Sequence, residues 1–179
     1  MCGLDNEAVQ LLAQVLSRCR RLKTLLFEGN KFDERAIPDM TKILKNVKAL
    51  RSLSIRSHFA LQAIGHEMIM RVLSDTSTRN FNHVKELYFD RISIQAIISL
   101  HLYFEERNYE WLEALKFRIW PVSCQEKNNV TKVVSNLISK NSSLKFLMIE
   151  GKLTMPKVNA FSMNKKLRKL ILADEVSFD

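Results

Sequence analysis

Residues that could carry catalysis or bind a metal ion are few and scattered along these 179 residues. Glu67 follows His66 but is not followed by a second histidine three residues on, so the zinc-protease motif is absent. No glycine-rich phosphate loop and no nucleophile elbow occurs. The four histidines lack the paired spacing of metal ligands: His58, His66, His83 and His101. We therefore expect no catalytic, metal-binding or cofactor-binding residue, and a protein that is not an enzyme.

The charge balance indicates the chemistry of a binding partner instead. Lys and Arg number 28 against 19 Asp and Glu, a formal net charge of +9. A surface with this excess favours an acidic protein or a nucleic acid over another basic surface. Which of these partners fits the protein depends on where the cations lie in the fold.

A short apolar pattern recurs six times and indicates the elements that position these charges. It has the form LxxLxL, allows Val, Ile or Phe at its first and last slots, and has Leu at the middle slot every time. Its last two apolar slots are two residues apart, which is typical of one face of a short strand. We predict strands near 24–28, 52–56, 86–90, 114–118, 146–150 and 169–173, in a single domain spanning 1–179. The first slots lie 28, 34, 28, 32 and 23 residues apart.

Segments with the other period lie between these strands. Apolar residues at i, i+3, i+4, i+7 and i+8 predict amphipathic helices over 8–16, 36–47, 61–72 and 130–138. Strands joined through a helix must be parallel, and the crossover should be right-handed. The predicted fold is α/β: a right-handed β-α solenoid of about six parallel strands on the concave face, with helices on the convex face.

Several segments resemble one known family. The stretch RLKTLLFEGNKF, preceded by NEAVQLLAQVLSRC, and the later HVKELYFD, WLEALKF and SLKFLMIEG resemble leucine-rich repeats of the ribonuclease-inhibitor-like subclass. The resemblance implies a solenoid that binds other proteins, and the family includes inhibitors, immune sensors, actin-capping proteins and GTPase activators. The chain departs from the family because only Asn30 occupies the slot of the strand-end asparagine. Loop insertions are expected around 74–82 and 121–128, and a short helix near 158–163.

The strand pattern assigns side chains to surfaces. One residue after the first apolar slot, five of the six side chains are cationic, and Glu113 is the exception. We call these five cations the basic rim and expect them to bind a partner along one edge of the sheet: Lys23, Arg51, Lys85, Lys145 and Arg168. Arg20, Arg21, Lys48, His83, Lys165 and Lys166 would thicken this edge.

Two further rows are expected on the concave face. One alternates in charge and should neutralise itself: Glu28, Arg56, Asp90, Arg118, Glu150 and Ala173. The other, together with a nearby phenylalanine, gives a largely apolar concave strip that is typical of a protein contact. Its proposed contact residues are Leu26, Tyr88, Lys116, Phe146, Met148 and Ile171.

The end of the sequence and its cysteines complete the expectations. The last repeat should be partly open beside Leu170 and Leu172, so Val176 and Phe178 are expected to contact another subunit or a continuation of the array. Cys2, Cys19 and Cys124 form no CxxC pair and are typical of reduced thiols. The most apolar stretch, 92–104, is shorter than the roughly 20 residues of a membrane span. We expect no membrane insertion and an intracellular setting, cytoplasmic or cytoskeletal, with an organelle as the alternative.

Three functions follow as hypotheses. The first is a non-enzymatic interaction module or scaffold subunit of a larger assembly, which binds an acidic protein partner. The second is an RNA-associated protein that uses the same rim, with aromatic side chains for stacking bases: Trp111, Trp120 and Tyr88. The third, regulation of a small GTPase or ATPase, is implied by the family resemblance alone.

Overall fold

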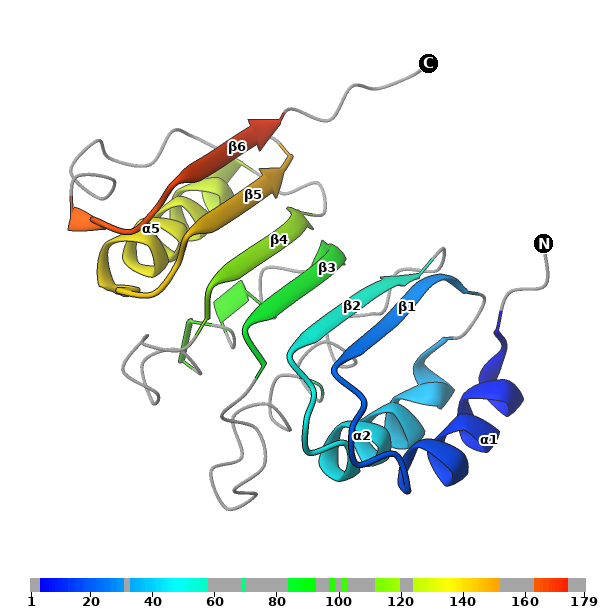
Figure 1. The fold of residues 1–179 in the computed structure, drawn as a ribbon. Helices are drawn as coiled ribbons and strands as arrows, with labels where there is room; N and C mark the ends of the chain where they lie inside the picture. The colour runs from blue at the N-terminus through cyan, green and yellow to red at the C-terminus, as the bar shows by residue number, and fades with distance from the viewer. Residues whose placement is uncertain are drawn as a thin grey trace.

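The fold is given by a computed structural model, which describes residues 4–30, 33–57, 69, 84–92, 97–98, 101–102, 112–119, 124–151 and 163–173. Six strands form one sheet, all parallel and in chain order (Figure 1): β1 (Thr24–Asn30), β2 (Ser52–Ser57), β3 (Glu86–Ile92), β4 (Ala114–Ile119), β5 (Phe146–Glu150) and β6 (Lys169–Ala173). The prediction of an α/β fold with six parallel strands is confirmed.

The leucine at the middle slot sets the register of the sheet. In successive strands the paired residues are Leu25, Leu53, Leu87, Leu115, Leu147 and Leu170. The first five are at most 8% exposed, whereas Leu170, on the edge strand β6, is 36% exposed. A shift of one residue would turn every such leucine to the opposite face, so the apolar alternation specifies the register strongly.

Helices cover the face to which these leucines point. The described helices are α1 (Asn6–Leu16), α2 (Ile37–Asn46), preceded by the 3₁₀ turn η1 (Glu34–Ala36), and α5 (Cys124–Lys140). Val9 of α1, Met40 of α2 and Val134 of α5 are at most 1% exposed and share one core with the strand leucines. In Figure 1, α1 and α2 lie together beneath β1 and β2, and α5 lies beside β5 and β6.

Two buried asparagines connect α5 to the strands that follow it. The Oδ1 of Asn141 accepts hydrogen bonds from the backbone N–H groups of Ser143 and Leu144, both at 2.9 Å. The side chain of Asn164 donates to the carbonyls of Ile138 and Asn141, at 3.0 and 2.9 Å. Helix ends leave backbone carbonyls without partners, so Asn164 satisfies carbonyls at the end of α5 from the next repeat. The sequence analysis did not identify these asparagines.

The loop insertion predicted around 121–128 is partly wrong, because a helix occupies part of that range. Residues from Cys124 onward belong to α5, because the helical period begins earlier than the apolar stripe at 130–138 suggested. The other predicted insertion, at 74–82, lies outside the described residues. The helices predicted at 61–72 and near 158–163 also lie outside them, except for the buried Ile69 and for Met163.

Gly151, directly after β5, is a position that requires glycine. Its φ is +130°, and a Cβ there would lie 3.3 Å from the carbonyl oxygen of Ile119. L-residues with side chains rarely adopt this backbone conformation.

Among the described helices, none is long and apolar enough to cross a membrane.

Replacing Leu53, which is fully buried, with alanine should lower the free energy of unfolding by about 2–5 kcal/mol, because it removes apolar contacts and leaves a cavity. Urea unfolding followed by circular dichroism measures the change. The matched control is Leu26→Ala on the neighbouring strand, since Leu26 is 57% exposed; its effect should be within about 0.5 kcal/mol. Equal losses for the two variants would contradict the assignment of faces.

Candidate protein-interaction surface

The backbone at the basic rim repeats the same geometry at every step of the sheet. The carbonyl of Lys23 accepts hydrogen bonds from the N–H groups of Arg51 and Ser52, at 2.7 and 3.0 Å. The same pair of bonds recurs at the other four steps, on the carbonyls of Arg51, Lys85, Glu113 and Lys145. Parallel strands are about 4.8 Å apart, so the rim forms a row about 24 Å long from Lys23 to Arg168.

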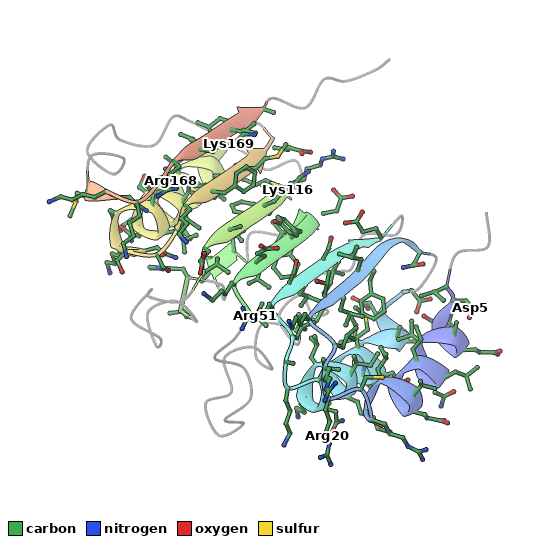
Figure 2. All side chains as sticks on the ribbon, viewed as in Figure 1. Asp5, Arg20, Arg51, Lys116, Arg168 and Lys169 are labelled. Carbon is green, nitrogen blue, oxygen red and sulfur yellow. The ribbon has the colours of Figure 1, made fainter. Side chains whose placement is uncertain are left out.

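All five cations of the basic rim have exposed side chains. Figure 2 shows Arg51 and Arg168 at the amino-terminal ends of their strands, along the same edge of the sheet. Helices α1 and α2 end at this edge and add further exposed cations nearby: Arg18, Arg20, Arg21, Lys45 and Lys48. Of these cations, Lys45 lies in the last turn of α2, where the helix dipole favours a positive charge. This residue therefore also stabilises α2.

Glu113 divides the basic rim into paired and unpaired cations. Its two carboxylate oxygens accept hydrogen bonds from the Nζ atoms of Lys145 and Lys85, at 2.6 and 2.5 Å. The hydrogen bonds from Lys145 and then Lys85 lower the pKa of Glu113 to about 2. Among the described residues, no acidic side chain pairs with Lys23, Arg51 or Arg168. The free positive charge of the rim therefore lies at its two ends.

On the opposite face of the sheet from the helices, the described side chains of the charged row are internally paired. Arg118 donates to Glu150 through Nε and Nη2, at 2.8 and 2.6 Å, and its Nη1 lies 3.6 Å from Oδ1 of Asp90. The Nζ of Lys116 lies 3.5 Å from the other oxygen of Glu150. Burial acts to raise the pKa of Glu150, but Arg118 and Lys116 outweigh it and hold this pKa below its usual value. At the start of the row, Glu28 accepts a hydrogen bond from Ser54 at 2.7 Å.

The residues of the concave strip are less open than the sequence analysis expected. Leu26 is 57% exposed, whereas the other five strip residues are half-buried. Burial, with the nearby charge of Glu86, raises the pKa of Tyr88. Lys169 covers the ring of Phe146, with its Nζ 5.8 Å from the ring centroid. The strip is therefore a mixed surface whose most exposed residue lies at the β1 edge.

Five other residues with expected roles lie outside the described residues: Val176, Phe178, Trp111, Trp120 and His83. Within the described part of the chain, no group of three His, Cys, Asp or Glu side chains is arranged to hold a metal ion.

Sequence reasoning also missed the role of Glu113, which it treated as an interruption of the cationic series. The signal was its place in that series, because residues at equivalent repeat positions become neighbours on adjacent strands. A carboxylate between two lysines is then within reach of both.

A solved structure has a fold similar to that of this chain. No protein-family model and no curated protein matches this sequence. The solved structure of leiomodin-1 actin-binding site 2 is similar, with a TM-score of 0.63 over 84% of this chain and 86% of that chain. The identity is 13%, so the likeness concerns the fold alone. Together with the repeated LxxLxL strands, it supports a leucine-rich-repeat-like fold.

Glu113 should remain ionised far into the acid range. Its folded pKa of about 2 is below the ordinary 4.5, so its stabilising contribution is present above about pH 4.5 and is lost as the pH falls towards 2. A carboxyl-detected NMR titration should give an apparent pKa near 2. In the double variant Lys85→Met/Lys145→Met the pKa should return towards 4.5, and an unchanged value would show that the lysines are not its cause.

Proposed function

We propose that the chain is a non-enzymatic protein-interaction module that binds an acidic protein surface through its basic rim. The observation that carries this proposal is the row of exposed cations on neighbouring strands, held at regular spacing by the repeated backbone hydrogen bonds. The first contacts that we assign to the partner are Lys23, Arg51 and Arg168, which pair with no acidic side chain among the described residues.

Glu113 illustrates how the rim engages a carboxylate. Its carboxylate accepts hydrogen bonds from the Nζ atoms of two lysines, one on each side, at N···O distances of 2.5 and 2.6 Å. Lys23 and Arg51 lie on adjacent strands, so a carboxylate supplied by a partner would meet two cations in a similar way. Charge-assisted hydrogen bonds of this kind are stronger than neutral ones, whereas salt screens exposed charges. We therefore expect binding that weakens with salt.

The structural likeness supports a role in protein binding. The leiomodin-1 structure with this fold is an actin-binding site, which makes actin a suitable first partner to test. We further propose that the fold belongs to the ribonuclease-inhibitor-like subclass, with right-handed crossovers and helices on a convex face. We also propose that the chain acts as a scaffold inside the cell, for example at the cytoskeleton.

RNA binding is the less favoured function. Stacking of bases needs aromatic side chains beside free cations. Tyr88 is half-buried, and Lys116 on the neighbouring strand is engaged by Glu150. The open face around Tyr88 therefore lacks a free lysine at that position.

Reversing charge at the open end of the basic rim should abolish binding of an acidic probe. Lys23→Glu/Arg51→Glu should lower affinity for a fluorescent oligoglutamate peptide, and for actin filaments if actin is the partner, by at least tenfold. Each cation removed contributes up to about 1 kcal/mol, and the new carboxylates repel the probe. Fluorescence anisotropy and co-sedimentation measure the two affinities.

The matched control is Lys42→Glu/Lys132→Glu, which reverses two exposed lysines within α2 and α5 and lowers the net charge by the same four units. This control should retain most of the affinity. Equal losses would show that net charge, not the rim, governs binding. Tighter binding to a nonspecific RNA than to either acidic probe, with a steep salt dependence, would favour the RNA hypothesis.

Removing the internal carboxylate should strengthen acidic binding. Glu113→Gln frees Lys85 and Lys145, and we expect about a 2- to 10-fold gain in affinity for the oligoglutamate peptide at low salt. Glu34→Gln, at the start of η1 and away from the rim, is the control for loss of one negative charge. A gain no larger than in this control would count against the middle of the rim as a contact.

A further inference from the structure

The α1/β1 end of the fold exposes apolar side chains on both of its elements. Leu11 and Val15 of α1 are 63% and 60% exposed, and Leu26 of β1 is 57% exposed. β1 is an edge strand of the sheet, and no described element pairs with its outer side. An exposed strand edge beside apolar side chains is a surface to which another chain can add.

The exposed flank of α1 points away from the rest of the fold. Val9 and Ala13 are fully buried in the core. On the side of η1, Asn6 exchanges hydrogen bonds with Asp33, at 3.0 and 3.1 Å. Leu11 and Val15 are four residues apart and therefore lie one turn apart on the same flank. Their exposure of 63% and 60% shows that most of this flank faces solvent.

Charge is divided between the two edges of this end. Exposed cations follow the C-terminus of α1: Arg18, Arg20 and Arg21. Exposed acids lie at the opposite end of α1, near the end of β1: Asp5 and Glu7. These two elements meet at the acidic edge, because the backbone N–H of Leu4 donates to the side chain of Asn30 at 3.0 Å. Figure 2 shows Asp5 and Arg20 at opposite ends of α1.

We infer that the α1/β1 end binds a second copy of the same chain in antiparallel orientation. A two-fold axis across α1 places the basic edge of each copy against the acidic edge of the other, and brings Leu11 and Val15 of the two copies together. Two copies packed in parallel orientation would instead place like charges side by side. Self-complementarity of one patch is what a two-fold interface requires. This dimer does not depend on binding of an acidic partner.

Charge reversal on each edge tests the inference directly. One variant carries Glu7→Lys and the other Arg18→Glu; neither residue belongs to the basic rim, and Asp5, which caps α1 through the N–H of Ala8, is kept. Sedimentation equilibrium and light scattering at micromolar concentrations should show a dimer for the wild type and monomers for each variant alone. An equimolar mixture of the variants should restore a dimer, because their edges are again opposite in charge.

A second variant tests the apolar flank. Leu11→Glu/Val15→Glu should be monomeric, with the far-ultraviolet circular dichroism of the wild type, since both side chains are exposed. A wild type that stays monomeric throughout the concentration range would overturn the inference. So would a higher assembly in place of a dimer, or a mixture of charge variants that remains monomeric. If Leu11→Glu/Val15→Glu loses the dimer but binds oligoglutamate as the wild type does, this interface is separate from the surface of the proposed function.

Discussion

Parallel stacking of six strands in one register is the constraint on which the structure depends. It arises from two interactions that repeat at each step, namely the middle leucines packing on the helix-covered face and the rim carbonyl receiving two N–H groups from the next strand. Because the hydrogen bonds use backbone atoms, they tolerate repeats of different length. Side chains at equivalent positions thereby become neighbours, and the surfaces of the sheet are sets of such rows.

The rows differ in how far their charges are satisfied within the chain. On the open face, Arg118 lies between two carboxylates, and Lys116 also reaches Glu150, so this region is largely neutral. At the rim a single carboxylate, Glu113, serves two lysines and leaves the outer cations without an acidic partner among the described residues. A surface whose charges are already paired gains little from a charged partner, since the partner must compete with short internal hydrogen bonds. Within the described part of the chain, the outer cations of the rim have no such internal hydrogen bond to a carboxylate, which is why the proposed function uses them.

A fold of this kind does not define a function, because the sheet and helices only present side chains. The likeness to an actin-binding structure concerns the arrangement of elements, and at 13% identity most surface residues differ. The contacts that set partner choice must therefore be read from this chain's own exposed residues. We propose two such groups, a charged row along the sheet edge and an end at α1 and β1 that binds a second copy of the chain.

The sequence by itself determined the strands, their parallel order and the helix-covered face, because LxxLxL alternation and the helical stripes are local patterns that the core enforces. It also placed the cations in one row, since repeat position becomes position along the sheet. It could not show that Glu113 reaches two lysines or that Asn164 satisfies the carbonyls of Ile138 and Asn141, because these contacts join residues 23 to 32 positions apart. Nor could it show that five of the six strip residues would be half-buried while Leu11 and Val15 stay exposed. Burial depends on which neighbours pack against each side chain, and only the tertiary structure decided that.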